Sequence, residues 1–344
     1  MDTAVPSSIG VRQGSCKGPA LFLFIIQAAL ETMDWPVEKP QFCTTKDGKV
    51  TGTRWNLRRD VTAFELWASL FADDCALLFN WCQDLITGTT YLYHHLRKFG
   101  LLMHVGRGET ASKTEAMFVP APRQAHDEGD QTNFAVDGGF ISFTHEFKYL
   151  GSLIHQSLTS DADVTAKLAK AAAAFGALRQ CFFSNRFVRP KEKGQVYITL
   201  ILTILLYGSE SWCLREDLYR RLRVFHNQCM RAMCRVNRSH TRKFRISTAQ
   251  LCERLGIKPF DTYYNARLLR WAGHVARMPM DRMPRRLLTG WVSNRRLVGA
   301  PQMTFGRTLN KALRAKGLPT TFAGERGWQR LALDRVTWRE RTRA

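Results

Sequence analysis

The sequence is poor in acidic residues, and this shortage is its most informative compositional feature. Its 344 residues include 29 Asp and Glu against 51 Lys and Arg, for a formal net charge of +22. A cationic excess of this size favours a polyanionic partner. Nucleic acid is the leading candidate, because neutralising phosphates releases counterions and supplies affinity without sequence information. An anionic membrane surface is the alternative, although no basic amphipathic helix stands apart as an anchor.

Long apolar runs are also absent. The stretches Ala20 to Leu30 and Tyr197 to Tyr207 are too short for a bilayer, which takes about twenty residues, so they predict buried helices. Residues 2–10 are neither basic nor apolar, and therefore do not resemble a secretory signal. These observations predict no membrane partner and a location inside the cell, in the nucleus or the cytoplasm. The hydrophobic fraction of 45% argues against wholesale disorder.

Paired cysteine spacings are missing as well, since none of the nine cysteines belongs to a Cys-x-x-Cys pair. The cluster that could suggest zinc contains His226, Cys229, Cys234 and His240. Its spacing matches no standard zinc finger, and it falls within an amphipathic helical pattern. We therefore expect buried or half-buried free thiols, with zinc binding as the alternative. Free thiols fit a reducing compartment.

Two adjacent acids stand out against this background, in the tetrapeptide Phe71-Ala72-Asp73-Asp74. Apolar residues precede it at 64–70 and follow it at 75–79, which predicts a β-hairpin with both acids at its turn. Hard cations such as Mg²⁺ prefer carboxylate oxygens, and a rigid turn holds such oxygens in place for phosphoryl transfer. The plainer interpretation is a structural turn, because Asp is a favoured turn residue.

Three further segments accompany this tetrapeptide. Upstream, Arg12-Gln13-Gly14 belongs to a loop that ends at Gly18-Pro19 and leads into an apolar helix. A loop of small, basic and amide residues at a helix start suits contact with a sugar-phosphate backbone. Downstream lie Ser112-Lys113-Thr114 and then Phe147-Lys148-Tyr149-Leu150-Gly151.

In order and spacing, these four segments resemble motifs B, C, D and E of the reverse transcriptase of non-LTR (LINE-like) retrotransposons. Two later segments, 205–212 and 270–278, are similar to the region that follows the polymerase domain in such elements, so the resemblance covers nearly the whole chain. It implies an RNA-directed DNA polymerase that transfers nucleotides with Mg²⁺ or Mn²⁺. The implied partners are an RNA template, a DNA primer and deoxynucleoside triphosphates.

The resemblance also implies chemical roles for individual residues. Asp73 would be a principal metal ligand, and Asp74 its supporting neighbour. Lys113 would lie near the triphosphate, where a cation can neutralise or protonate the leaving pyrophosphate. The alternative for Lys113 is an exposed lysine at the start of a strand.

Two short segments would position the nucleic acid. Arg12, Gln13 and Gly14 would place the template strand and the incoming nucleotide, with a plain glycine loop as the alternative. The segment Tyr149-Leu150-Gly151 would form the primer grip, although an aromatic residue followed by Leu-Gly also suits plain packing at a strand edge.

One part of the family's pattern is missing. The fingers and motif A, which carries another metal-binding Asp, precede motif B in this family, whereas here Asp2 is the only acid before Arg12. We expect Met1 to lie inside a longer reading frame. We also expect the chain to hold Mg²⁺ or Mn²⁺ weakly, because a two-ion site without one of its main carboxylates is incomplete. Two classes of function remain open: a reverse-transcriptase fragment that is inactive in this form, or a non-catalytic nucleic-acid-binding remnant.

The hydrophobic pattern predicts an α+β fold. By the resemblance, residues 1–156 form a partial palm, an antiparallel sheet with helices, in which 134–143 and 147–154 are two strands. Residues 157–290 are expected to form an all-helical, thumb-like region, and residues 291–344 a basic C-terminal region. Within the helical part, we predict helices at 161–178, 190–207, 216–236, 248–255, 260–278 and 282–291.

The C-terminal region combines basic and aromatic residues. Between residues 277 and 343 the sequence has sixteen Lys and Arg but few acids. Arginine with aromatic neighbours suits phosphate pairing and base stacking. The alternative is a solvated basic surface in which the aromatic residues are core anchors. The aromatic residues concerned are Trp291, Phe305, Trp328 and Trp338.

Overall fold

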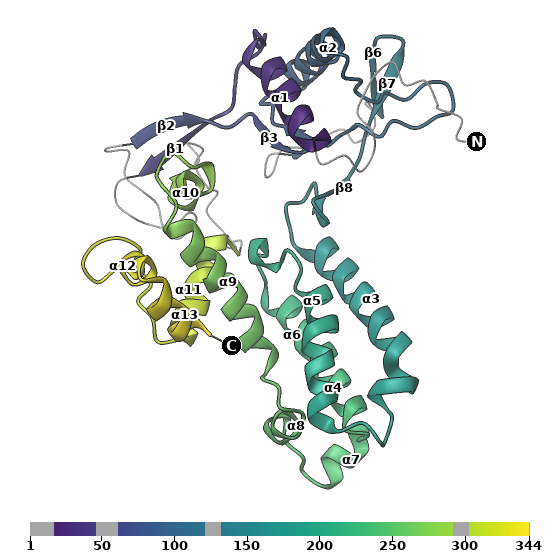
Figure 1. The fold of residues 1–344 in the computed structure, drawn as a ribbon, viewed down its shortest axis with the longest axis vertical. Coiled ribbons are helices and arrows are strands. Elements are labelled where there is room, and N and C mark those ends of the chain that lie inside the picture. The colour runs from purple at the N-terminus through teal and green to yellow at the C-terminus, as the bar shows by residue number, and fades with distance from the viewer. Residues whose placement is uncertain (1–16, 46–60, 121–131, 292–302, 344) are drawn as a thin grey trace. The chain divides into compact units, whose positions relative to one another are not determined.

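The computed structural model describes residues 17–45, 61–120, 132–291 and 303–343. The chain divides into two compact units, one of residues 1–41 and 65–145 and the other of residues 42–64 and 146–344. Helices dominate, and the strands form small, mainly antiparallel sheets (Figure 1). The predicted α+β class is therefore confirmed.

The first unit packs two helices beside small sheets. Pro19 occupies the first turn of α1, where its missing N–H leaves no helical hydrogen bond unmade. The ring of His95, on α2, hydrogen-bonds the carbonyl oxygen of Ala29 on α1 at 2.7 Å and ties the two helices together. The elements of this unit are α1 (Gly18–Glu31), β3 (Ala68–Phe71), β4 (Asp74–Leu77), α2 (Cys82–Lys98), β5 (Glu115–Ala116), β6 (Asn133–Val136) and β7 (Gly139–Phe143).

A turn at Asp137-Gly138 corrects one prediction. Segment 134–143 was expected to be a single strand, but β6 and β7 pair antiparallel within it and Val136 lies opposite Gly139. Both turn residues have positive φ, 46° and 73°, as a type I′ hairpin turn requires. The Asp-Gly pair therefore reverses the chain. Strand β5 then adds parallel to β7, which places β7 at the centre of the sheet.

The second unit is mostly helical. Its strands are β1 (Gln41–Thr45), β2 (Val61–Glu65) and β10 (Gly290–Trp291), which share one sheet in the order β10-β1-β2, and the hairpin of β8 (Glu146–Tyr149) and β9 (Ser152–His155). Its helices are α3 (Asp161–Leu178), α4 (Pro190–Val196), α5 (Leu202–Leu205), α6 (Glu216–Met233), α7 (Arg238–Lys243), α8 (Thr248–Leu255), α9 (Phe260–Ala276), α10 (Met283–Leu288), α11 (Phe305–Ala315), α12 (Trp328–Leu333) and α13 (Arg335–Thr342).

Most predicted helices are present, with two differences. The segment 190–207 is continuous, but a π-helical turn, Tyr197–Ile201, joins α4 to α5. The helix expected over 282–291 ends at Leu288, and the chain continues as β10, which pairs with β1. Among the described helices, none is long and apolar enough to cross a membrane.

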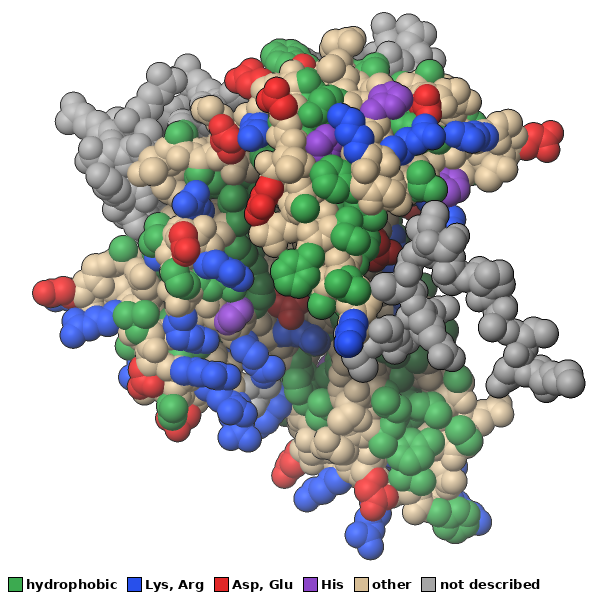
Figure 2. All heavy atoms as spheres, turned by 45° about the horizontal axis from the view of Figure 1, so that its top comes forward, with side chains coloured by type: hydrophobic (Ala, Val, Ile, Leu, Met, Phe, Trp, Pro, Cys, Tyr) green, Lys and Arg blue, Asp and Glu red, His purple; other side chains and the backbone are tan. Residues whose placement is uncertain are grey.

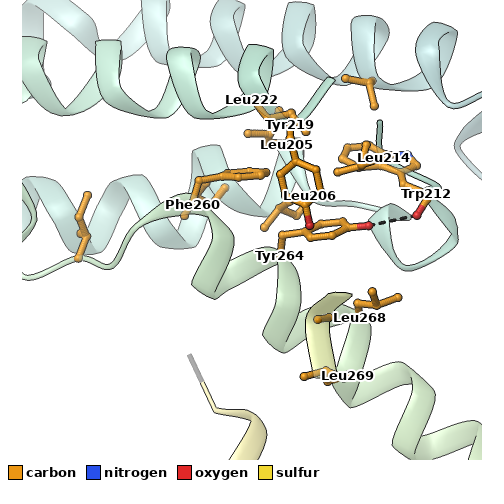
Figure 3. Close-up of a cluster of buried hydrophobic side chains, with 14 of the residues drawn as sticks. Leu205, Leu206, Trp212, Leu214, Tyr219, Leu222, Phe260, Tyr264, Leu268 and Leu269 are labelled. Carbon is orange, nitrogen blue, oxygen red and sulfur yellow. Dashed lines mark hydrogen bonds between the residues drawn. The ribbon is translucent and has the colours of Figure 1, made fainter. Parts of the chain in front are cut away.

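A large apolar core holds the helical unit together. Figure 3 shows its centre, where side chains from α5, α6 and α9 meet around Trp212 and Tyr264. The hydroxyl of Tyr264 donates to the carbonyl oxygen of Trp212 at 3.1 Å, so the buried ring also satisfies its polar end. The C-terminal helices pack on α9: the Trp338 indole N–H donates to the carbonyl oxygen of Leu269 at 3.0 Å. The C-terminal region is thus part of the folded unit.

Candidate functional site

The two acids lie at the tip of a hairpin, as predicted. Strands β3 and β4 are antiparallel, and Phe71 pairs with Asp74. This register leaves Ala72 and Asp73 as the two loop residues, and both acids are exposed. The alternation of apolar residues around the turn was therefore a correct guide to the local structure.

The turn is strained at Ala72. Its φ of 53° lies in the left-handed region, which costs a residue with a Cβ about 1–2 kcal/mol. Glycine is the usual residue at the first loop position of such two-residue hairpins. Strain of this kind collects at functional sites, where the surrounding structure imposes it.

The described residues do not complete a two-ion site around this turn. Carboxylate oxygens have the right chemistry for Mg²⁺, but two adjacent side chains supply few of the six or more ligands that such an ion takes. Within the described part of the chain, no three His, Cys, Asp or Glu side chains lie close enough together to hold a metal ion. Asp73 and Asp74 therefore form an incomplete donor set for a pair of ions.

The other residues implied for nucleotide binding are only partly placed. Lys113 is exposed in the loop before β5, and its backbone N–H donates to Nδ1 of His104 at 3.1 Å. The hydroxyl of Ser112 donates to the carbonyl oxygen of His104 at 3.2 Å, so this loop is fastened to His104 at two points. Arg12, Gln13 and Gly14 lie outside the described residues.

Tyr149, Leu150 and Gly151 lie at the tip of a second hairpin. The segment 147–154 was expected to be one strand, but it reverses at Leu150 and Gly151, whose φ angles are 48° and 82°. As at Asp137, two successive residues with positive φ make the tight turn that the pattern of apolar residues did not reveal. This hairpin belongs to the second, helical unit.

Two side chains of the helical unit hydrogen-bond the main-chain carbonyls at the tip of this hairpin. The ammonium group of Lys167, on α3, donates to the carbonyl oxygen of Gly151 at 2.7 Å. The hydroxyl of Tyr207 donates to the carbonyl oxygen of Leu150 at 3.2 Å. Lys167 also lies over the Tyr207 ring, 4.6 Å from its centroid, a distance typical of a cation–π contact. Lys167 therefore contacts both the Leu150-Gly151 turn and the Tyr207 ring, whose hydroxyl binds the same turn.

A buried carboxylate on α3 binds the second strand of the same hairpin. Asp163, only 4% exposed, accepts from the backbone N–H of Leu153 at 3.0 Å and from the Trp212 indole N–H at 2.7 Å. Lys167 is equally buried one turn further along α3. Burial lowers the pKa of Lys167, and the negative charge of Asp163 opposes that shift. The two residues give the base of the hairpin a fixed polar framework.

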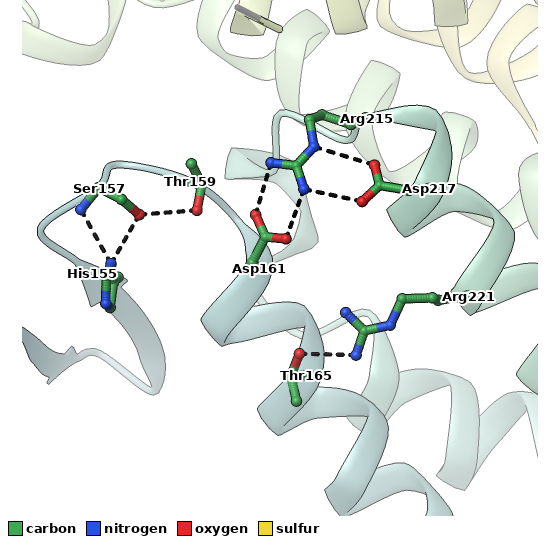
Figure 4. A network of polar contacts seen from close by, with 8 residues as sticks. All are labelled: His155, Ser157, Thr159, Asp161, Thr165, Arg215, Asp217 and Arg221. Atoms are coloured by element: carbon green, nitrogen blue, oxygen red, sulfur yellow. Dashed lines mark hydrogen bonds and ion pairs between the residues drawn. The ribbon is translucent and has the colours of Figure 1, made fainter. Parts of the chain in front are cut away.

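Exposed polar contacts surround this framework. Figure 4 shows Asp161 in a bidentate pair with Arg215, which also holds Asp217, and Arg221 donating to the hydroxyl of Thr165. Hydrogen bonds from Arg215 to both carboxylates and their negative charge raise the pKa of its guanidinium. These contacts join the start of α3 to α6.

The His226 cluster is a packing arrangement among the described residues. His226 is buried, with Nδ1 2.9 Å from the Tyr197 hydroxyl and Nε2 3.1 Å from the carbonyl oxygen of Lys258. Burial lowers the pKa of His226 to about 4, so the ring is neutral at pH 7. Cys229 and Cys234 are buried free thiols, whereas His240 is exposed. Both His226 nitrogens are therefore already engaged within the protein.

The C-terminal tryptophans are core residues. Trp328 and Trp338 are 0% and 2% exposed, and their rings stack at 5.5 Å. The expectation that aromatic residues here would stack on bases is therefore wrong for these two, because the helices bury them. Arg277 and Arg285 are also structural: the first donates to the carbonyl oxygen of Ala332 at 2.6 Å, and the second is buried over the ring of Phe322.

Other basic side chains of this region face outward. Figure 2 shows a dense group of Lys and Arg side chains at the lower left of the face in view. Two of the lysines are engaged, since Lys311 pairs with Glu216 at 2.9 Å and Lys316 donates to the carbonyl oxygen of Arg343 at 2.7 Å. In the described part of this region the exposed arginines are Arg282, Arg307, Arg314, Arg326, Arg330, Arg335, Arg339, Arg341 and Arg343.

Comparison with known proteins gives one informative similarity. The chain is 23% identical over 270 residues to an uncharacterized transposon-derived protein of Caenorhabditis elegans, an alignment that covers 78% of this chain and 92% of that protein. No family model and no solved structure matches the chain. The similarity supports a transposon-related origin.

Proposed function

We propose that this chain is the reverse-transcriptase-like part of a transposon protein, and that in this form it binds RNA and DNA strands without extending a primer. The observation that carries this proposal is the row of exposed arginines on a chain with a net charge of +22. Exposed guanidinium groups suit bidentate contacts with phosphates. Similarity to a transposon-derived protein supports the assignment to a mobile element.

The proposal includes the ligands of the reverse-transcriptase family as inherited features. An RNA template, a DNA primer and deoxynucleoside triphosphates would be the original partners, and Asp73 and Asp74 the remaining ligands of Mg²⁺ or Mn²⁺. Lys113, Arg12, Gln13 and Gly14 would have served the nucleotide and template, and the Tyr149-Leu150-Gly151 turn the primer. Two adjacent exposed carboxylates are too few to hold the two ions that nucleotidyl transfer requires.

Primer extension provides the test of this proposal. With an RNA template, an annealed DNA primer, deoxynucleotides and Mg²⁺ or Mn²⁺, we expect the chain to give little or no extension product. The reason is the incomplete donor set around Asp73. Robust incorporation that disappears in Asp73→Ala would contradict the proposal, because another acid would then have to complete the site.

Salt titration tests the binding half of the proposal. The triple variant R335Q/R339Q/R341Q removes three exposed charges from α13 without touching its buried Trp338. We expect weaker binding of an RNA or DNA oligonucleotide, with a plot of log K against log salt that is shallower by about 2–3, since each phosphate contact contributes about 0.7–0.9. Fluorescence anisotropy at several salt concentrations measures both quantities.

A matched control removes three cations that already have partners. Arg215, Arg223 and Lys311 each lie in an ion pair, so R215Q/R223Q/K311Q changes the net charge equally but removes few free cations. Equal slopes for the two triple variants would mean that net charge alone governs binding. Deleting all residues after Gly290 is a poorer test, because that deletion would also remove the buried Trp328 and Trp338.

A further inference from the structure

Helix α7 lies at the end of the helical unit that is away from the β8–β9 hairpin (Figure 1). Asn237 caps α7, its side-chain oxygen accepting from the backbone N–H of His240 at 2.6 Å. No residue of α7 is buried. A six-residue helix without a buried face gains little stability from core packing. Its exposed side chains are therefore available for contacts with a partner.

An aromatic pair lies on this exposed surface. Phe244 directly follows α7 and is 58% exposed. Its ring centroid is 4.4 Å from that of His240, and the ammonium group of Lys243 lies 5.6 Å from its centre. Phe244 is thus a largely exposed aromatic residue with a cation beside its ring, a combination that suits stacking with a nucleic-acid base.

The surroundings of Phe244 are strongly basic. Residues 231–258 contain eight Lys and Arg but one acid, Glu253. Five of these cations lie between residues 235 and 245, where all are exposed, and within the described part of the chain none of the five lies in an ion pair. Their charges are thus available to an external anion. The five are Arg235, Arg238, Arg242, Lys243 and Arg245.

A second ring–cation pair lies at the same end of the unit. Phe187 is 81% exposed, with the Arg186 guanidinium 4.8 Å from its ring centroid. This pair belongs to the loop that leads into α4, and Lys193 of α4 donates to the carbonyl oxygen of Met233 at the end of α6 at 3.4 Å. Helix α4 and the end of α6 are therefore neighbours, and Figure 1 shows α4 and α7 at the same end of the helical unit.

We propose that these segments, residues 186–191 and 235–245, form a platform for single-stranded nucleic acid. Bases would stack on the rings of Phe244 and Phe187, while phosphates contact the surrounding arginines. This inference rests on the proposed function. A single strand is favoured over a duplex because duplex bases are already stacked and cannot present their faces to a ring.

The platform is separate from the β8–β9 hairpin. Helix α3 contacts β9 at its beginning and leads, through a π-helical turn, to the Phe187 loop at its end. Its 18 residues span about 27 Å at 1.5 Å per residue. A strand held at the hairpin would need several further nucleotides to reach the platform, so the two surfaces are distinct contact points.

Anisotropy titration of the full chain with a fluorescein-labelled 20-nucleotide oligo(U) tests the proposal, with a 20-base-pair DNA duplex as the comparison ligand. We expect Phe244→Ala to weaken oligo(U) binding about 5- to 10-fold and to leave duplex binding unchanged, since one stacked base is worth about 1–3 kcal/mol. Phe244→Trp is expected to restore binding. R242Q/K243Q should also make the salt plot for oligo(U) shallower by about 1.4.

Leu333→Ala provides the control, because Leu333 is 60% exposed at the end of α12 and lies outside the platform. Wild-type affinity in Phe244→Ala, or equal losses for oligo(U) and duplex, would overturn the platform. A wild-type chain that binds neither ligand would instead overturn the proposed function. Because Phe244 is exposed, an unchanged melting temperature should accompany the loss of binding and separates it from unfolding.

Discussion

Replacing Asp163 by alanine is expected to lower the free energy of unfolding by about 3–5 kcal/mol. The carboxylate is 4% exposed and accepts hydrogen bonds from the backbone N–H of Leu153 and the indole N–H of Trp212. Alanine leaves both donors without their partner, and leaves the buried ammonium group of Lys167 without the nearby negative charge that opposes its desolvation. Urea denaturation followed by circular dichroism measures the change.

Asp161→Asn is the matched control, two residues earlier on the same helix. Asp161 pairs with Arg215 at 2.8 Å, but both side chains are well exposed, at 38% and 47%. An exposed ion pair contributes about 0–1 kcal/mol, so this variant should remain close to the wild type. Equal effects of the two substitutions would show that burial of Asp163 does not give it a special structural role.

The same substitution has a local consequence. Asp163 and Lys167 support β9 and the Gly151 turn respectively, so Asp163→Ala should loosen the β8–β9 hairpin before the helices unfold. Amide hydrogen exchange at Leu153 is expected to become faster than exchange in the middle of α9. Uniform acceleration across both elements would mean that the hairpin and the helices unfold together.

Local patterns predicted the hairpin tip at Asp73 and Asp74, but neither the Leu150-Gly151 turn nor the residues that hold that turn. Asp73 and Asp74 were placed correctly because alternating apolar residues around a pair of turn formers act within one stretch of chain. The partners of the Leu150-Gly151 turn are distant in sequence, since Tyr207 lies 57 residues beyond Leu150. No local periodicity can indicate such a pairing.

The sequence of α3 does indicate its buried polar pair. Asp163 and Lys167 are spaced i, i+4, and Val164 and Ala171 are buried on the same side of the helix. Two charged residues on a helix face that is otherwise apolar allow two interpretations. Either that face is not buried, or it is buried and the two charged groups have hydrogen-bond partners there. The structure has the second arrangement, built with Leu153 and Trp212.

The tryptophans of the C-terminal region show the opposite error. Trp328 and Trp338 lie close to several arginines in the sequence. That proximity predicted a surface on which the tryptophans would stack on bases, with core anchors as the alternative. In the folded chain the helices turn these tryptophans inward and most of the arginines outward, so neighbours in sequence occupy different environments. Two exposed rings, those of Phe187 and Phe244, lie instead in the region 157–290, which was expected to be helical.

Replacing Gly194 by alanine should destabilise the chain by about 3 kcal/mol, because α4 and α8 approach each other there without room for a Cβ. A methyl group on Gly194 would overlap the carbonyl oxygen of Leu255 and lie 2.8 Å from Cγ2 of Ile257. A backbone oxygen cannot turn aside as a flexible side chain can, so the two helices would have to separate. Overpacking of this kind typically costs 1–3 kcal/mol and sometimes more.

Gly176→Ala is the control for this prediction and should have the opposite sign. Gly176 lies in α3, where the position that its Cβ would take is open, with no atom within 4 Å beyond the adjacent backbone of its own helix. Alanine there is expected to stabilise the chain by about 0.5–1 kcal/mol, because glycine is the poorer helix former. Urea titrations of both variants, with an unchanged m-value, would assign the difference to the α4–α8 contact. A stabilising effect at both positions would mean that these helices have room to move apart, and that the close approach at Leu255 does not constrain the helical unit.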